Sequence, residues 1–347
     1  MKHTIFGESH GPAIGVTLEG VPAGLTLNME RMNRELARRA TGNSPLSTAR
    51  KEADEVELLS GVFEGKTTGA PLTALIRNGD HHSADYEAIR YTPRPSHGDY
   101  AGYVKSGGHL DYRGGGHFSG RLTAPLVVAG AIAKQVLAER GVTVGAHIST
   151  IYGIHDASLE DTAELCAVAD KPFPVLDDAA GEAMQAAILE AKQEGDSVGG
   201  SIECAVTGLP AGLGAPDFDC NVEGIFSRYL FSVPAVKTVD FGAGVAFALM
   251  RGSEANDPFA VADGKIITKT NYAGGVNGGI TNGMPILFEV TLRPTPSISL
   301  PQESVDLRTG EETEMEIEGR HDPCVVHRAV PVIEAAAALA ACTLLGI

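Results

Sequence analysis

The sequence predicts an α/β fold built in layers, with two similar halves packed into one body. Short segments of alternating apolar residues, typical of strands, are interspersed with longer segments whose apolar residues recur at helical spacing. In addition, residues 7–25 and 195–213 match without a gap at nine of nineteen positions. This match indicates an internal duplication, with halves near 1–145 and 190–347 inside a single domain of residues 1–347.

Two further pairs of segments support the duplication because they follow in the same order. The glycine-rich residues 61–72 resemble residues 275–286, and the helix predicted around Pro125 resembles the alanine-rich helix predicted after Pro331. Chance similarity among glycine-rich turns is the alternative explanation. Three landmarks in one order favour the duplication.

Strands and helices are assigned from this patterning along the chain. The predicted strands are residues 13–18, 56–59, 72–77, 201–206, 237–241 and 286–293, and the predicted helices are residues 29–39, 122–140, 178–193, 220–231 and 329–345. Pro125 falls in the first turn of its helix, where a missing N–H costs little, and Gly141 ends that helix. Asp178 begins the next helix, where the helix dipole favours acids, and Gly195 follows its end.

Composition excludes several classes of function. The formal net charge of −17 argues against nucleic acid or an anionic membrane as a partner, so an anionic substrate would need a local cluster of arginines. The five cysteines are scattered without CxxC spacing, which fits a reducing compartment and no zinc ribbon. The N-terminal residues form no apolar signal run, and no stretch approaches a transmembrane length. We therefore expect a cytoplasmic protein.

One glycine-rich stretch, DYRGGGHFSGRLTA at residues 111–124, is central to the site that we predict. It places four glycines between Arg113 and Arg121 and leads into the helix that contains Pro125. Backbone N–H groups free of Cβ crowding, a helix N-terminus and two guanidinium groups would meet there. That combination predicts an anion site, with phosphate as the usual anion, whereas a tight turn with unrelated surface arginines is the alternative.

Histidines occur in four polar loops that could meet around this stretch. The loops are FGESHG with His10, RPSHGDY with His97, DYRGGGHFSGR with His117, and EGRHDPCVVHR with His321. A histidine in a loop rich in glycine or proline is available as an acid or base near neutral pH. A solvated or structural histidine is the alternative for any single loop, but four such loops favour a shared site.

Other catalytic classes leave no signature in the sequence. No HExxH or comparable spacing of ligands occurs, so no catalytic metal is expected. The chain has no GxSxG elbow, no GxxxxGK[ST] loop and no strand–GxGxxG–helix unit. The loop RPTPSI could hold backbone donors and carbonyls against a flat ligand, because prolines stand on both sides of Thr295, although a turn that ends a strand is the alternative.

Taken together, these loops resemble the chorismate synthase family. The motifs that carry the resemblance are FGESHG, RPSHGDY, DYRGGG…SGR.T, VPAVKTVDFGAG, GSEAND, NYAGGVNGG, RPTPSI and GRHDPC, in the family's order and across nearly the whole chain. The resemblance implies a lyase that converts 5-enolpyruvylshikimate-3-phosphate to chorismate and phosphate, a 1,4-elimination that depends on reduced FMN without net redox change. It also implies a β-α-β sandwich of two similar intertwined halves, assembled as a homotetramer.

The resemblance further implies roles for individual residues. His10 looks like the residue that protonates the reduced flavin, and His97 like the acid that protonates the departing phosphate. Asp322 resembles the carboxylate that helps to remove the C6 proton. Ser119 is also expected to be a catalytic residue. The substrate's anionic groups would be bound by Arg50, Arg113, Arg121 and Arg320. Flavin contacts would come from His117, Phe118, Ser119, Pro234, Ala235, Gly278, Arg293, Pro294, Thr295, Pro296, Ser297 and Arg320.

The chain departs from the family pattern in two places. Beside the flavin, His117 and Phe118 stand where an arginine and a serine are usual, and Pro45 stands where a further basic residue is usual. Arg39 remains as the candidate contact for NADPH as a reductant, and an external flavin reductase is the other source of reduced cofactor that we consider.

Two rival functions share the same loops. A phosphate-ester hydrolase is disfavoured because the sequence has neither metal-ligand spacing nor a nucleophile elbow. A non-catalytic protein that binds flavin or a phosphorylated metabolite is disfavoured because His10, His97 and Asp322 are all retained.

Overall fold

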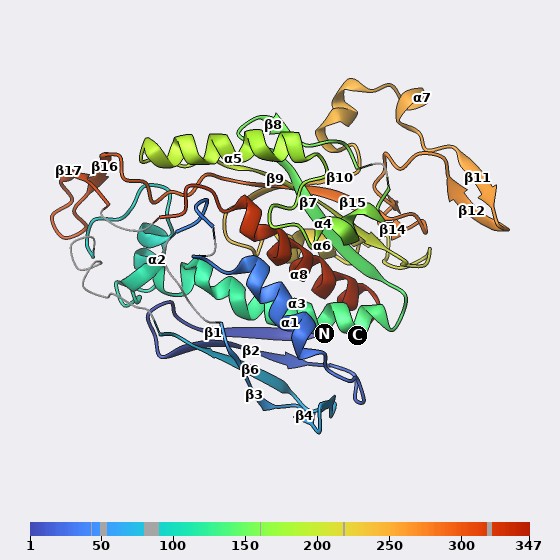
Figure 1. The fold of residues 1–347 in the computed structure, drawn as a ribbon, viewed down its shortest axis with the longest axis horizontal. Helices are drawn as coiled ribbons and strands as arrows, with labels where there is room; N and C mark the ends of the chain where they lie inside the picture. Colours follow the sequence, from blue (N-terminus) through green and yellow to red (C-terminus); the bar gives the residue numbers. More distant parts are fainter. Residues whose placement is uncertain (43, 49–53, 80–89, 160, 218, 318–320) are drawn as a thin grey trace.

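Two antiparallel sheets enclose a layer of helices in the computed structural model (Figure 1). The structure describes residues 1–42, 44–48, 54–79, 90–159, 161–217, 219–317 and 321–347. One sheet has the strand order β1-β2-β6-β3 and lies below the helices in the view of Figure 1, and the other has the order β10-β15-β9-β7-β8 and lies above them. The predicted layered fold is therefore confirmed as a β-α-β sandwich.

The strands pair as follows. The first sheet contains β1 (Lys2–Gly7), β2 (Ala13–Glu19), β6 (Leu72–Arg77) and β3 (Val56–Ser60). The second contains β10 (Val236–Phe241), β15 (Ile286–Leu292), β9 (Gly200–Thr207), β7 (Thr143–Ile151) and β8 (Ile154–His155). Four small hairpins are β4–β5 (Val62–Phe63, Lys66–Thr67), β11–β12 (Phe259–Ala262, Lys265–Thr268), β13–β14 (Val276–Asn277, Ile280–Thr281) and β16–β17 (Gln302–Val305, Glu312–Met315).

The helices α1, α3, α6 and α8 form the layer between the sheets, and α5 lies along the upper sheet (Figure 1). The α-helices are α1 (Met29–Arg39), α2 (Asp99–Lys105), α3 (Thr123–Ala138), α4 (Glu164–Val168), α5 (Asp178–Gln193), α6 (Val222–Leu230), α7 (Gly252–Ala255) and α8 (Val326–Leu344). Short 3-10 turns are η2 (Arg113–Phe118), η3 (Gly120–Leu122) and η4 (Gly244–Leu249). The five predicted helices are confirmed as α1, α3, α5, α6 and α8.

The two sheets share one topology. The order β1-β2-β6-β3 corresponds to β7-β9-β15-β10. The paired strands and the four central helices run strand, strand, helix, strand, strand, helix in each half, when the small hairpins, the 3-10 turns, the edge strand β8 and the helices α2, α4, α5 and α7 are set aside. The helices α1 and α6 hold equivalent places, as do α3 and α8. This agreement supports the internal duplication, which stays a prediction. Strand β7 spans the predicted boundary at residue 145 and belongs to the second sheet.

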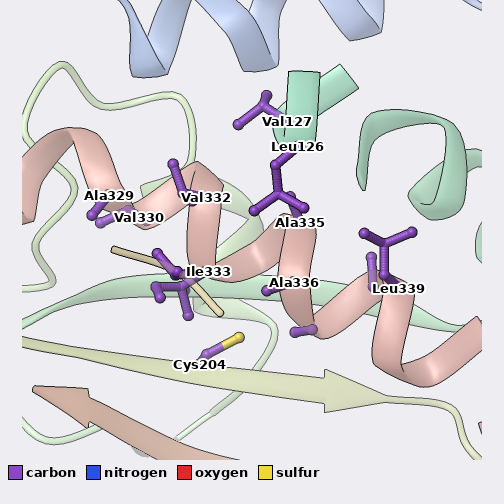
Figure 2. Close-up of a cluster of buried hydrophobic side chains, with 14 of the residues drawn as sticks. Leu126, Val127, Cys204, Ala329, Val330, Val332, Ile333, Ala335, Ala336 and Leu339 are labelled. Atoms are coloured by element: carbon purple, nitrogen blue, oxygen red, sulfur yellow. The ribbon is translucent and has the colours of Figure 1, made fainter. Parts of the chain in front are cut away.

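The sandwich centre is formed by α3 and α8, which approach closely because small residues line their contact. A Cβ placed on Gly130 would lie 2.2 Å from the Cβ of Ala335. Figure 2 shows α8 between α3, which contributes Leu126 and Val127, and β9, which contributes Cys204. Burial on every side explains why α8 is rich in alanine, since larger side chains would separate the layers.

These core helices correct one expectation from the sequence. Residues 113–138 and α8 are long and apolar enough to cross a membrane, so the expectation that no stretch approaches that length was wrong. However, 89% and 83% of their most apolar windows are buried inside the fold. A helix enclosed by two sheets is apolar on all sides for the same reason as a membrane helix, because no side of it meets water.

A buried ion cluster connects three helices of the central layer. Glu334 on α8 accepts hydrogen bonds from Lys134 Nζ at 2.5 Å and from Arg38 Nη2 at 2.9 Å, and its side chain is 1% exposed. Its Oε1 atom also accepts the N–H of Ala146 on β7 at 3.2 Å. Burial opposes the charge on Glu334, but Lys134 and Arg38 outweigh burial and hold its pKa below the ordinary value.

Replacement of this buried carboxylate gives a stability prediction. We expect Glu334→Ala to lower the free energy of unfolding by about 3–5 kcal/mol, because Lys134 and Arg38 lose a charge partner in the interior. Denaturant unfolding measures the change. The matched control is Glu57→Ala, which breaks the Arg77–Glu57 pair, whose side chains are 68% and 43% exposed, and should cost about 0–1 kcal/mol. Equal losses in both variants would contradict the prediction.

Candidate active site

The predicted site loops meet at the end of the molecule where α3 and α8 begin. Both helices start on the side of the helical layer that faces α2 (Figure 1). The turns η2 and η3 lead into α3, and residues 321–325 lead into α8. Since a helix N-terminus carries the positive end of the helix dipole, two such starts favour anionic groups at this end.

The glycine turn at residues 114–116 brings two of the predicted catalytic histidines together. Its three glycines have φ angles of 59°, 80° and 52°, which side chains with a Cβ rarely adopt. A Cβ on Gly114 would lie 2.2 Å from His10 Nδ1, and a Cβ on Gly115 would lie 3.1 Å from His97 Cε1. The absence of side chains on this turn therefore allows both imidazole rings to pack directly against it.

A backbone hydrogen bond from the FGESHG loop reinforces this contact. The N–H of Ser9 donates to the carbonyl of Gly116 at 3.1 Å, which fixes the loop on the glycine turn. His10 and Ser9 are both buried. Within the described part of the chain, the Ser9 hydroxyl has no hydrogen-bond partner. A buried hydroxyl in that condition is a candidate for contact with a ligand.

Arg121 is held in the interior by Asp54. Its Nη1 atom bonds one oxygen of Asp54, and Arg39 Nη1 donates to the other oxygen at 2.9 Å. Arg39 Nε also donates to Thr123 Oγ1 at 3.0 Å. Both guanidinium groups are buried, and the predicted contact of Arg121 with a substrate stays a prediction. The interior position of Arg39 does not favour the predicted contact with NADPH.

Asn78 connects Arg121 to the loop that carries His10. Arg121 Nε donates to Asn78 Oδ1 at 3.2 Å. The amide nitrogen of Asn78 donates to the carbonyls of Glu8 and Gly11 at 3.0 and 2.9 Å. The side chain of Asn78 therefore couples the positions of the histidine loop and the buried arginine.

His97 lies in a loop that is fixed by hydrogen bonds of Arg94 and Asp99. His97 Nδ1 lies 2.6 Å from Asp99 Oδ1, and Arg94 Nε donates to Asp99 Oδ2 at 2.7 Å. Burial alone would raise the pKa of Asp99, but hydrogen bonds from Arg94 and His97 outweigh burial and hold its pKa well below the ordinary value. Asp99 is therefore an ionised carboxylate beside the histidine ring.

The RPTPSI loop adjoins the His97 loop through two arginines. Arg94 Nη1 donates to Ser297 Oγ at 3.2 Å, and Arg293 Nη1 donates to the carbonyl of Ser96 at 2.5 Å. Ser96 has φ of 60°, an uncommon backbone conformation for a residue other than glycine. Such conformations persist where the surroundings hold them, as Arg293 does here.

The loop before α8 brings Asp322 to the same end of the molecule. Asp322 Oδ1 accepts the N–H of Thr48 at 3.0 Å, and its Oδ2 lies 3.4 Å from Arg328 Nη2. The pKa of the adjacent His321 is lowered mainly by burial and also by the positive charge of Arg94. The charge of Arg94 thus reaches His321, which places the loop of Asp322 within electrostatic range of the loop of His97.

The remaining residues of the glycine stretch have individual partners. Arg113 is partly exposed and donates to Asp111 Oδ2 at 2.8 Å. Ser119 caps η3, where its Oγ accepts the N–H of Arg121 at 3.3 Å. His117 Nδ1 lies 3.0 Å from the carbonyl of Gly7.

Phe118, which departs from the family pattern, packs against neighbouring residues. A Cβ on Gly102 would lie 2.6 Å from the ring of Phe118, and one on Gly98 would lie 3.0 Å from it. The ring therefore packs against glycines of α2 and its N-terminal cap, while 45% of the side chain stays exposed.

The predicted flavin residues on the second half of the chain are only partly brought together. The N–H of Arg293 donates to the carbonyl of Ala235 at 3.0 Å, so the loop with Pro234 adjoins the start of RPTPSI. Gly278 instead lies in the β13–β14 hairpin, which packs at the opposite end of β15 from Arg293. Within one chain the contact of Gly278 with the site stays a prediction. Arg50 and Arg320 lie outside the described residues.

Several residues of this cluster were not among the predicted site residues. Arg94 and Asp99 flank His97 within its own motif, so a charged pair around a histidine was the available signal. Asp54 and Asn78 had no such signal, because they reach Arg121 from separate segments of the chain.

A wide hollow formed by described residues lies elsewhere. It has a volume of about 840 Å³ and is lined by residues from both chain ends, including His3 and Ile347, and by residues of and next to α6, including Tyr229. A much smaller space of about 20 Å³ adjoins Arg94 and Asp99. We assign the site to the histidine cluster, because the larger hollow contains none of the predicted catalytic residues.

Comparisons with known proteins identify the family of this chain. The family model described as chorismate synthase matches residues 1–345. Chorismate synthase of Thermococcus gammatolerans is 49% identical over 335 residues, which are 96% of this chain and 93% of the relative. That of Methanocella arvoryzae is 49% identical over 338 residues, which are 97% of this chain and 90% of the relative.

A solved structure gives the same result for the fold. A crystal structure of chorismate synthase has a TM-score of 0.78 to this chain at 29% sequence identity, and the match covers 99% of this chain and 91% of that chain. The chain therefore belongs to the chorismate synthase family of carbon–oxygen lyases, enzymes of aromatic biosynthesis.

Proposed function

We propose that this chain converts 5-enolpyruvylshikimate-3-phosphate into chorismate and phosphate by a 1,4-elimination that depends on reduced FMN without net redox change. The observation that carries the proposal is the packing of His10 and His97 against one glycine turn, with Arg121 buried nearby. Two acid–base groups and buried cations at one place suit a reaction that moves a proton and releases an anion.

The residues of the cluster fit a planar cofactor with a phosphate. The hydroxyls of Ser9 and Thr295 are buried and have no partner among the described residues, so both are available to a ligand. His117 and Phe118 present exposed rings, and Arg293 presents a guanidinium group. Together with the other predicted flavin residues, these groups would hold FMN. When bound, reduced FMN would supply an electron transiently and recover it.

Arginines and helix starts would orient the substrate. The substrate carries a phosphate and two carboxylates, and Arg113 and Arg121, with Arg50 and Arg320, would bind these groups. The N-termini of α3 and α8 add a favourable potential for anions. Burial of Arg121 strengthens its interaction with an anion, because the surroundings screen the charge less than water does.

Three side chains would manage the protons. His97 donates a proton to the phosphate oxygen as the C3–O bond breaks, and Asp322 assists removal of the C6 proton. His10 keeps the reduced cofactor in the correct protonation state. General acid catalysis of this kind contributes about 10²–10⁴-fold.

One anaerobic assay tests the function. Protein, dithionite-reduced FMN and 5-enolpyruvylshikimate-3-phosphate are mixed, and chorismate absorbance and released phosphate are followed. We expect both products in equal amounts and neither product without FMN. Phosphate release without FMN would indicate a hydrolase, and FMN binding without either product would indicate a binding protein.

His10→Ala is expected to lower turnover by at least about tenfold when chemically reduced FMN is supplied, because His10 packs on the glycine turn of the site. Stopped-flow formation of chorismate measures the effect. His109→Ala is the matched control, since His109 is exposed and should be replaceable without loss. An unchanged rate in His10→Ala would remove His10 from the mechanism.

We also propose a cytoplasmic homotetramer that receives reduced FMN from a separate reductase. Apolar side chains on the β11–β12 hairpin support assembly, since Phe259, Val261 and Ile266 are 73%, 75% and 74% exposed in the single chain. Light scattering of the purified protein measures the number of copies. Oxidised FMN with NADPH and no reductase should give no chorismate.

A further inference from the structure

The contact between Asp99 and His97 determines which ring nitrogen carries the proton. His97 Nδ1 lies 2.6 Å from Asp99 Oδ1, and an ionised carboxylate can only accept a hydrogen bond. Arg94 Nη2 lies 3.1 Å from the same ring nitrogen, but it is a donor and has Asp99 Oδ1 at 2.9 Å as its acceptor. The shorter contact with an acceptor requires a proton on Nδ1.

Arg94 prevents the carboxylate of Asp99 from turning away. The backbone N–H and Nε of Arg94 donate to Asp99 Oδ2 at 3.1 and 2.7 Å, and Nη2 donates to Oδ1. Both oxygens are therefore engaged by a buried guanidinium group, which Ser297 holds from its other side. The direction of the Asp99–His97 bond is fixed by three bonds that do not involve the histidine.

The other edge of the ring faces the glycine turn. A Cβ on Gly115 would lie 3.4 Å from His97 Nε2 and 3.1 Å from Cε1. The Nε2 atom thus borders the turn that also contacts His10, while Nδ1 is turned toward Asp99.

We propose that Asp99, held by Arg94, is a positioning residue that keeps one proton on His97 Nδ1, so that Nε2 is the atom that gives its proton to the departing phosphate. This inference rests on the proposed acid role of His97. In the step, the proton leaves Nε2 and bonds to the phosphate oxygen as the C3–O bond breaks. The ring becomes neutral with its remaining proton still donated to Asp99, so the product tautomer keeps its hydrogen bond.

Asp99→Asn separates this role from simple packing, because the side chains have the same shape. Arg94 makes two bonds to Oδ2 and one to Oδ1, so the amide oxygen should occupy the Oδ2 position and the amide N–H₂ should face His97. Nδ1 must then accept, which moves the proton of the neutral ring to Nε2. If His97 instead carried protons on both ring nitrogens, its Nδ1–H would point at the amide N–H₂ of the new side chain, and two donors would face each other.

The first test records the tautomer of His97 by long-range ¹H–¹⁵N correlation in the full chain, without substrate or cofactor. We expect the Nδ1–H form in the unmodified chain and the Nε2–H form in Asp99→Asn. The control is Asp306→Asn, which removes one carboxylate from a partly exposed pair with Arg308 and should leave the His97 signal unchanged. An unchanged tautomer in Asp99→Asn would overturn the proposal.

The second test is a double-mutant cycle on kcat with reduced FMN. We expect Asp99→Asn to lower kcat by at least about tenfold with little change in KM, and to have no further effect in the His97→Ala background. Equal losses in both backgrounds would overturn the proposal. If the tautomer changes but His97→Ala keeps full turnover, the proposed acid role of His97 fails. If His97→Ala loses turnover and the tautomer of Asp99→Asn does not change, only the inference about Asp99 fails.

Discussion

Replacement of His97 by alanine is expected to lower kcat by at least about tenfold, toward the about 10²–10⁴-fold that a general acid contributes. The reason is chemical, since phosphate is a better leaving group when a proton reaches it as the C–O bond breaks. His97 has the required position, with Nε2 beside the glycine turn and Nδ1 held by Asp99. Chorismate formation under single-turnover conditions with reduced FMN measures the change.

Binding of FMN should survive the replacement of His97. We expect the affinity of His97→Ala for FMN to change by less than about threefold, because the predicted flavin contacts come from other loops. Wild-type kcat in His97→Ala would show that His97 takes no part in the reaction. A parallel loss of FMN binding and kcat would instead assign the residue to the cofactor site.

Gly114→Ala should damage the site without removing any functional group. The residue has φ of 59°, where an alanine costs about 1–2 kcal/mol, and its new Cβ would lie 2.2 Å from the ring of His10. The ring of His10 or the turn must therefore move. We expect turnover to fall at least about tenfold and the free energy of unfolding to fall by about 1–2 kcal/mol or more.

Gly120→Ala is the matched control in the same stretch. Its φ is not in the left-handed region, and a Cβ there would meet no atom of the described residues within 4 Å. We expect kcat and the denaturation midpoint of this variant to stay near those of the unmodified chain. Equal losses in the Gly114 and Gly120 variants would mean that the stretch tolerates no side chain for general reasons, and the contact with His10 would lose its significance.

The long helices were predictable because their signal is repeated over several turns. Residues 29–39 and 178–193 were predicted as helices and are α1 and α5 with the same bounds. The start of α8 was placed at 329, three residues late, because the polar His327 and Arg328 interrupt the apolar pattern of its first turn. The physical basis is local, since a helix buries one stripe of its own sequence.

Among the longer strands, β1 and β7 escaped prediction because their patterns do not alternate. Strand β1 is at a sheet edge with most side chains partly exposed, so little distinguishes its inner and outer faces. Strand β7 buries His147, which lies 2.9 Å from Asp156 Oδ2 and 2.9 Å from Glu203 Oε2. A buried polar residue is tolerated there only because partners from two other segments satisfy it.

Some features of the candidate site could also be recognised in the sequence, whereas others could not. The motif containing His97 could be recognised, and so could the glycine turn, because each is a short segment with distinctive residue types. The place of Asp54 between Arg39 and Arg121 could not be recognised, because these residues come from separate parts of the chain. Gly278 shows the converse, since its motif was recognised but lies at the other end of β15 within one chain.

The sequence alone provides the layered α/β class, the long helices, the loops that hold the histidines and, through the resemblance of its motifs, the family. The folded chain adds that His10 and His97 contact one glycine turn and that Asp99 meets a defined nitrogen of His97. The difference has a physical cause. Periodicity and turn chemistry act between neighbours in the chain, whereas these contacts depend on how strands pair and helices pack across long separations, which no short segment specifies.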